Sequence, residues 1–191
     1  MKKTSTEAKT HPAKRFDPFS DRLSRDIRNS LSVAFIRSIK QRNVQILDQK
    51  ARKWLNQDLA LVYTDYIQSR LERYRDVFDQ ILQDRASELL TQAVYLWNAG
   101  LFFEVHEMLE GFWRGTSGDK REALKGLIKA ATAYAHLDSG HQKAWESLCA
   151  KSAKLLGEHG EHLPFLSNLD VLIRKMENVD PRPPELVVDV K

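Results

Sequence analysis

Residues 97–114, with the sequence WNAGLFFEVHEMLEGFWR, decide the fold that the sequence predicts. Gly100 is expected to end a helix over residues 86–98, because a glycine in the left-handed conformation commonly follows the last turn of a helix. A second helix is expected over residues 101–114, which are mostly apolar or aromatic. The stretch therefore predicts two successive helices joined by a tight turn, the second of them largely buried.

Three further helices are expected after this stretch, separated by glycines and a proline. They cover residues 119–140, 142–156 and 167–178. Asp119 is expected to cap the first of these helices, with Glu122 completing a capping box. Prolines at three positions predict that residues 181–191 form an irregular tail.

The N-terminal half shows a different pattern. Residues 21–85 repeat apolar side chains at helical spacing and contain no glycine or proline. They predict one very long helix or two to three helices, with Asn43 and Asn56 as the expected breaks. Residues 1–20 are basic and poor in apolar side chains, so they are expected to form a disordered arm.

Together these patterns predict an all-α fold, in which a compact bundle of about five helices over residues 86–180 follows a helical extension over residues 21–85. The 191 residues carry a net charge of +4, and no motif that reads RNA or DNA accompanies this weak basicity. A single cysteine, Cys149, forms no internal disulfide and favours a reducing compartment. No apolar run approaches the ~20 residues of a transmembrane helix. We therefore expect a cytoplasmic protein with a small-molecule or protein partner, and self-association through the N-terminal helices.

His106 and the carboxylates that follow it form the candidate site. In a helix over residues 101–114, His106, Glu110 and Trp113 share one face because they are spaced by four and three positions. The pattern His106-Glu107-x-x-Glu110 resembles the zinc-binding motif HExxH with its second histidine replaced by glutamate. His106 and Glu110 are therefore candidate metal ligands, and Glu107 is the candidate catalytic base.

A third ligand is expected from the neighbouring helix. A short loop joins residues 101–114 to residues 119–140, so the two helices should pack side by side and bring His136 near the site. The expected ion is zinc, iron or manganese, and the expected chemistry is metal-assisted hydrolysis. Trp113, Arg114 and Lys129 are expected to border the site and bind a ligand.

A purely structural role for the same residues is the alternative. Lys125 and Lys129 are positioned to pair with the acidic side chains of the site and so fix the register of the two helices. Gly100 and Gly140 each precede an amphipathic helix, as in the hairpins of tetratricopeptide repeats. The alternative function is therefore a non-catalytic helical interaction module.

Residues 97–114 resemble the signature of the DUF309 family, which in outline reads NxGxFFExHExLExxW. A second block, residues 126–131 with His136 and Gly140, is similar to the family's following helix. The resemblance covers residues 86–157. DUF309 proteins are small helical proteins of unknown function that are sometimes labelled predicted metal-dependent hydrolases. The resemblance therefore implies an all-helical fold and a metal-dependent hydrolase as the expected activity.

Overall fold

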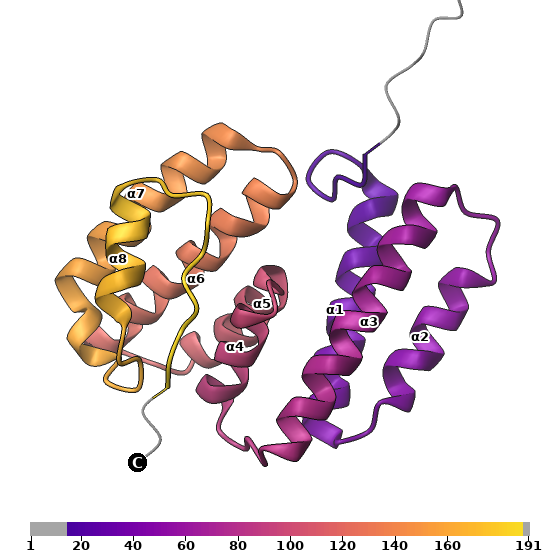
Figure 1. Ribbon diagram of the computed structural model, residues 1–191, viewed down its shortest axis with the longest axis horizontal. Helices are drawn as coiled ribbons and strands as arrows, with labels where there is room; N and C mark the ends of the chain where they lie inside the picture. Colours follow the sequence, from indigo (N-terminus) through magenta and orange to yellow (C-terminus); the bar gives the residue numbers. More distant parts are fainter. Residues whose placement is uncertain (1–14, 189–191) are drawn as a thin grey trace, which may run out of the picture.

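Eight α-helices make up most of residues 15–188, the part of the chain that the structure, a computed structural model, describes (Figure 1). They are α1 (Arg22–Gln41), α2 (Gln45–Leu55), α3 (Leu61–Gln83), α4 (Leu89–Asn98), α5 (Phe102–Trp113), α6 (Gly118–Asp138), α7 (Gln142–His159) and α8 (Leu169–Glu177), with a short 3₁₀ helix, η1 (Gly160–His162), before α8. The all-α prediction is confirmed, whereas a total of about five helices was too low; five of the eight, α4–α8, follow Arg85. Within the described residues, β-type pairing is limited to one isolated bridge between Leu166 and Val188.

The helices form two groups with α4 and α5 between them. Helices α1, α2 and α3 pack together on one side, and α6, α7 and α8 pack together on the other (Figure 1). Helix α5 contacts both α1 and α6, and α4 contacts α3. Side chains at the centre of the molecule therefore lie where the N-terminal helices meet the C-terminal ones.

Both asparagines expected to break the N-terminal helical region do so. Helix α1 ends at Arg42, which adopts the left-handed conformation with φ 49°, and Asn43 Oδ1 then accepts a 3.0 Å hydrogen bond from the Gln45 amide at the start of α2. Asn56 is the residue at which α2 ends. The region is therefore three helices, held together by a core in which Phe35 of α1 stacks on Tyr74 of α3 at 4.1 Å between ring centroids.

Helices α6 and α7 approach closely at Gly126. A Cβ atom at this position would lie 2.9 Å from the Cδ2 atom of Leu156, closer than real Cβ contacts come. Ser152 Oγ donates a 2.8 Å hydrogen bond to the Gly126 carbonyl at the same contact. The absence of a side chain at Gly126 therefore sets the distance between the two helices.

Several helix ends differ from those predicted, among them the start of α4, at Leu89 instead of residue 86, and the start of α8, at Leu169 instead of residue 167. Helix α6 starts one residue earlier than expected, with Ser117 as its N-cap residue, and Glu122 pairs with Lys125 at 3.0 Å. The capping box predicted for Asp119 is therefore wrong. Helix α7 continues through Gly157 to His159, because the contacts of α7 with α6 and α8 outweigh the helix-ending preference of an exposed glycine.

The expected N-terminal arm falls into two parts. Residues 1–14 lie outside the described residues. Residues 15–20, which we call the N-terminal strap, pack on the helices: Phe16 stacks on Tyr66 of α3 at 3.5 Å between ring centroids, and Phe19 stacks on His136 of α6 at 3.9 Å. Two aromatic side chains therefore anchor residues 15–20, which composition alone predicted to be disordered.

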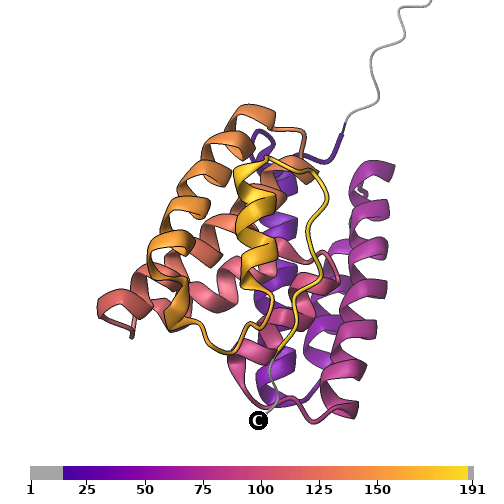
Figure 2. The same ribbon diagram turned by 60° about the vertical axis from the view of Figure 1, so that its left-hand side comes forward.

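The C-terminal tail is irregular as far as Val188, but it is attached to α4. Trp97 Nε1 donates a 2.8 Å hydrogen bond to the Pro184 carbonyl. The Asn98 side chain forms two bonds with the backbone of Leu186, at 2.8 and 2.9 Å. In Figure 2 the tail turns back after α8 and runs beside that helix. The tail therefore attaches the segment after α8 to the end of α4.

Candidate functional site

Helix α5 positions the candidate site. Gly100 has φ 69°, which allows the chain to turn between α4 and α5 in three residues. One face of α5 is buried and carries Phe102, Glu104, Val105, Met108 and Leu109. The partly exposed face carries His106, Glu107 and Glu110. The candidate residues thus lie on a helix that the core holds rigidly in place.

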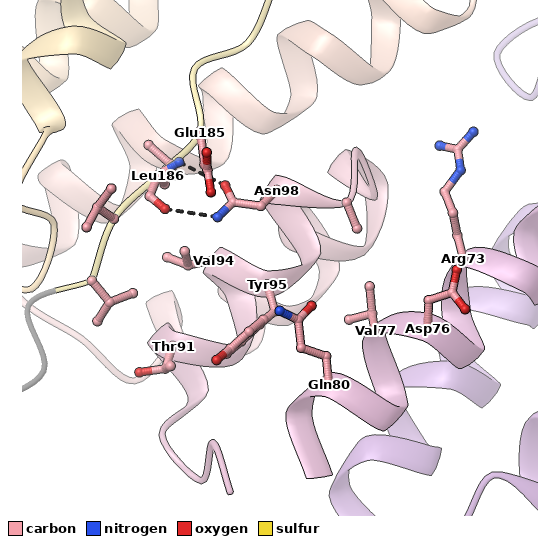
Figure 3. A pocket seen from close by; sticks show the side chains of 13 residues that line it. Arg73, Asp76, Val77, Gln80, Thr91, Val94, Tyr95, Asn98, Glu185 and Leu186 are labelled. Carbon is pink, nitrogen blue, oxygen red and sulfur yellow. Dashed lines mark hydrogen bonds between the residues drawn. The ribbon is translucent and has the colours of Figure 1, made fainter. Parts of the chain in front are cut away.

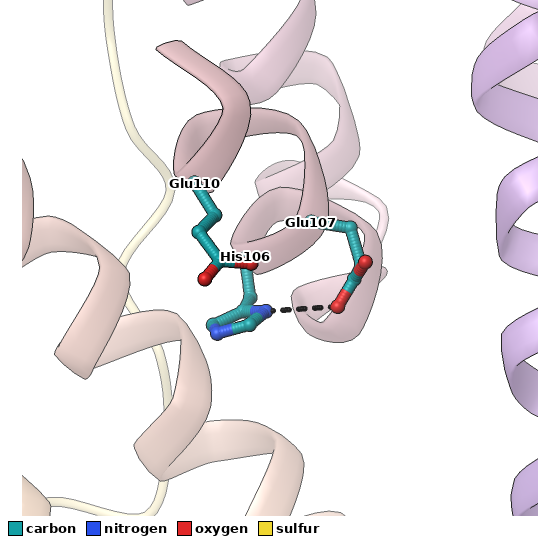
Figure 4. A group of neighbouring side chains, drawn as sticks. All are labelled: His106, Glu107 and Glu110. Atoms are coloured by element: carbon teal, nitrogen blue, oxygen red, sulfur yellow. Dashed lines mark hydrogen bonds and ion pairs between the residues drawn. The ribbon is translucent and has the colours of Figure 1, made fainter. Parts of the chain in front are cut away.

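His106, Glu107 and Glu110 converge, and we call them the α5 cluster (Figure 4). Each offers a ligand atom, and these three atoms lie within 4.8 Å of one another. His106 Nδ1 is 3.2 Å from Glu107 Oε1. The side chains are about one-third exposed, at 29%, 33% and 35% of their surface in sequence order. The cluster is therefore open to solvent on one side.

Electrostatics favour a charged Glu107. Its hydrogen bond with His106 lowers its carboxyl pKa against the opposing effect of burial, and the charges of Arg28 and Arg114 add to the lowering. Glu110 Oε1 lies 3.1 Å from Arg114 Nη2, one helical turn along α5. At neutral pH Glu107 is therefore present in the cluster as a carboxylate.

This donor set fits a divalent ion. One imidazole and two carboxylates suit manganese, iron and zinc, and three protein ligands with open positions are typical of catalytic rather than structural metal sites. The three ligand atoms are near enough to share an ion after small side-chain rotations. All three ligands come from a single helix, so the arrangement does not depend on the packing of a second element.

His136 lies in a different environment from the α5 cluster. It sits in the last turn of α6, where its ring stacks on Phe19 and meets His141 edge-on at 5.8 Å between ring centroids. Burial, together with the nearby charges of His141 and Arg28, lowers its pKa. Its Nδ1 atom is buried and has no hydrogen-bond partner among residues 15–188. The structure therefore places the predicted third ligand against the N-terminal strap instead of in the α5 cluster.

The predicted binding residues are spread over two surfaces. Arg114 is exposed and pairs with Glu110, while Trp113 lies under the guanidinium of Arg121 at 4.3 Å from the ring centroid. Burial and the neighbouring charges of Lys151 and Lys125 lower the pKa of Lys129, which lies on α6. Within the described residues, neither Lys125 nor Lys129 forms an ion pair with the α5 cluster.

Glu104 is a buried charged residue that sequence reasoning missed. Its side chain has no exposed surface, and its Oε1 atom accepts a 2.6 Å hydrogen bond from the hydroxyl of Tyr74 on α3. Its Oε2 atom faces Arg70 Nη1 at 3.8 Å. Glu104 falls three or four positions from Leu101 and Met108, so helical periodicity placed it on the apolar face. Its partners, Tyr74 and Arg70, are distant in sequence, and no sequence pattern links either of them to Glu104.

A cavity of about 590 Å³ lies away from the α5 cluster, between α3, α4 and the C-terminal tail (Figure 3). Its lining is mixed, with Arg73, Asp76 and Gln80 from α3 opposite Thr91 and Tyr95 from α4. Figure 3 also shows Asn98 bonded to the tail at one edge of this cavity. The cavity is not lined by any residue predicted to form the site.

Comparison with known proteins supports the family resemblance over part of the chain. Residues 90–148 match the model of DUF309, described as a domain of unknown function. An uncharacterised protein of Aquifex aeolicus (strain VF5) is 36% identical over 61 residues, which are 31% of this chain and 18% of the relative. No solved structure matches. The segment matched by the family model contains the α5 cluster and the whole of α6 but leaves out α1, α2 and α3.

Among the helices of residues 15–188, none is both long enough and apolar enough to cross a bilayer.

Proposed function

We propose that the α5 cluster binds a divalent metal ion and that the protein uses it to hydrolyse a small substrate. The observation that carries this proposal is the convergence of His106, Glu107 and Glu110 within 4.8 Å on a partly exposed face of a rigid helix. The expectation attached to DUF309 proteins, predicted metal-dependent hydrolysis, agrees with this donor set.

Each residue has a distinct role in the proposal. His106 and Glu110 hold the ion from positions one turn apart. Glu107 contributes one oxygen to the ion and keeps its other oxygen free to accept a proton from water, which its lowered pKa allows at neutral pH. A bound divalent ion supplies Lewis acidity, which favours loss of that proton. Arg114, exposed beside Glu110, is placed to attract an anionic group of the substrate.

Metal titration of the full chain without an affinity tag tests the proposal. Calorimetry with Mn²⁺, Fe²⁺ and Zn²⁺ is expected to show one ion bound per chain. His106→Ala and Glu110→Gln are expected to weaken binding at least about tenfold, and His162→Ala, which alters an exposed histidine outside the cluster, to leave it unchanged. A wild-type chain without measurable affinity, or equal binding by the His106 variant, would falsify the proposal. Hydrolysis is then assayed with small ester and phosphoester substrates on the metal-loaded protein.

A non-catalytic helical module is the second candidate, favoured by one observation. Every member of the α5 cluster already has a partner on its own helix, since His106 pairs with Glu107 and Glu110 pairs with Arg114. If the cluster only stabilises α5, Glu110→Gln lowers the free energy of unfolding while the wild-type chain binds no ion. The same titration and a urea melt thus separate the two candidates.

A cytoplasmic location and self-association through the N-terminal helices complete the proposal. The single cysteine, Cys149, is buried, and burial raises its thiol pKa to about 11, which makes it a packing residue. Val33 on α1 and Leu61 on α3 are exposed apolar residues, at 62% and 79%, that a second copy would cover. Sedimentation velocity of the wild-type chain and of Leu61→Gln measures the association.

A further inference from the structure

A second, smaller cavity lies where the N-terminal strap meets α1, α3, α5 and α6, and we call it the junction cavity. Its volume is about 130 Å³. Its walls include Phe16 of the strap, Arg28, Tyr66, Arg70 and Phe103. None of the three residues of the α5 cluster lines it. It is therefore a separate site from the proposed metal centre.

Arg28 brings an incompletely paired positive charge to this cavity. The residue is only 8% exposed. Its Nε and Nη2 atoms each donate a 3.1 Å hydrogen bond to the neutral side chain of Asn29, and within residues 15–188 it has no carboxylate at ion-pair distance. Burial lowers its pKa, which reflects the free energy needed to keep a guanidinium away from water. A charged group this deeply buried is normally paired with an anion.

Arg70 of α3, which also lines the cavity, is likewise incompletely paired. Its Nη1 atom is buried without a hydrogen-bond partner among the described residues, and so is Oε2 of Glu104. These two atoms are 3.8 Å apart, too far for a direct hydrogen bond. The ion pair therefore leaves Nη1 of Arg70 and Oε2 of Glu104 without a hydrogen bond.

The other walls are flat and apolar. Phe16 and Tyr66 stack with an interplanar angle of 8°, and the Arg28 guanidinium lies 3.8 Å from the centroid of Phe103. Glu104 neutralises one of the two arginines. The charges of Glu107, which is about one-third exposed, and of Asp138, at the exposed rim, also act on Arg28 and Arg70, but solvent screens them. One unbalanced charge beside aromatic walls matches a monoanion with a planar body.

We propose that the junction cavity binds a small monocarboxylate with a flat apolar body, whose carboxylate is held by Arg28 and Arg70. Guanidinium groups bind carboxylates through paired hydrogen bonds. At about 130 Å³ the cavity is slightly smaller than the cavity of about 150 Å³ known to hold benzene, so it limits the flat body to at most one ring. Inorganic phosphate fits less well, because its second negative charge exceeds the single positive charge left over and it has no surface for the aromatic walls.

Benzoate is the probe, and its neutral isostere benzamide is the control ligand. Binding is measured on the full chain by calorimetry and by NMR in the presence of EDTA, so that the result does not depend on a metal. Benzoate is expected to bind saturably, and benzamide at least about tenfold more weakly, as the loss of a charge-assisted hydrogen bond predicts. Amide shifts are expected to concentrate near Tyr66, Arg70 and Phe103.

Matched variants locate the site. Arg28→Gln is expected to weaken benzoate binding at least about tenfold, and Arg25→Gln, an exposed arginine on the same helix, to leave it unchanged. Arg28→Lys, which keeps the charge without the planar fork, is expected to weaken binding to an intermediate degree and covers the case in which the glutamine variant fails to fold.

Four results would overturn the proposal: no saturable benzoate binding at millimolar concentration, equal binding of benzamide, shifts centred away from the cavity, or binding of inorganic phosphate in preference to benzoate.

Discussion

Tyr74 on α3 and Glu104 on α5 are joined by a 2.6 Å hydrogen bond at the centre of the protein, donated by the tyrosine hydroxyl to Oε1 of the carboxylate. Burial and the charge of Glu104 raise the pKa of Tyr74 well above its ordinary value, so the hydroxyl stays a donor throughout the physiological range. Glu104 lies inside the DUF309 match, whereas Tyr74 lies outside it. The bond therefore ties the matched segment to the helices that precede it.

Removing this bond is expected to destabilise the whole chain. Tyr74→Phe leaves the Glu104 carboxylate buried with one donor fewer, which should lower the free energy of unfolding by about 1.5–3 kcal/mol. Urea denaturation followed by circular dichroism measures the loss. Tyr95→Phe is the matched control, because Tyr95 donates a bond of the same length to Asp84 at an exposed position. Equal losses in the two variants would contradict a special role for the buried bond.

The close approach of α6 and α7 gives a pair of glycine variants with opposite expectations. Gly126→Ala places a Cβ atom 2.9 Å from the Leu156 side chain, and we expect a loss of about 1–3 kcal/mol in unfolding free energy. Gly157→Ala meets no heavy atom within 4 Å on an exposed helical position, so a gain of about 0.5–1 kcal/mol is expected. Thermal melts compare both with the wild type; a neutral Gly126→Ala would mean that the two helices can separate freely.

Arg114 competes with a metal ion for Glu110. Its Nη2 atom lies 3.1 Å from Glu110 Oε1 at an exposed position, so this pair is weak. Arg114→Gln releases the carboxylate and is expected to strengthen Mn²⁺ binding by up to about fivefold, the equivalent of an exposed ion pair. Calorimetry measures the change, and Arg121→Gln provides the control on α6. Weaker binding in the Arg114 variant would argue against Glu110 as a ligand.

His136 makes stability depend on pH. Because the folded state lowers its pKa below 6.5, the unfolded chain takes up this proton first as the pH falls. The contribution of the neutral imidazole is complete above the unfolded pKa and is lost as the pH falls through the folded pKa. Facing groups are Phe19, His141, Arg28 and Asp17.

Urea melts at pH 7.5 and at pH 5.5 measure this effect. The wild type is expected to lose stability at the lower pH. His136→Phe keeps an aromatic ring against Phe19 without a titratable group and is expected to lose less. An unchanged pH dependence in His136→Phe would assign the effect to other groups.

Local sequence signals predicted the helices well. Gly100 acts as expected because a left-handed turn is a property of one residue and its neighbours. Asn43 and Asn56 mark real breaks for the same reason, since polar side chains interrupt a helix locally. The capping box at Asp119 failed because the helix already begins at Gly118, with Ser117 as its N-cap residue, and the Asp119 side chain pairs with His159 instead.

Contacts between distant segments could not be predicted in the same way. The spacing of His106, Glu107 and Glu110 along one helix fixes their proximity, so the sequence alone brought these three together. His136 was expected beside them because neighbouring helices pack, but the position of a residue at the end of α6 depends on what covers it. Phe19 covers it here, from 117 positions earlier in the chain, in a segment whose composition predicted disorder.

The hydrogen bonds between α4 and the C-terminal tail can form only late in the synthesis of the chain. Trp97 and Asn98 find their partners 87 and 88 positions downstream. A nascent chain leaves the ribosome N-terminus first, so the indole and amide at the end of α4 emerge long before Pro184 and Leu186 exist to receive them. During translation, the indole of Trp97 and the amide of Asn98 therefore lack these partners until the tail has emerged, and water or a chaperone can bind them in the meantime.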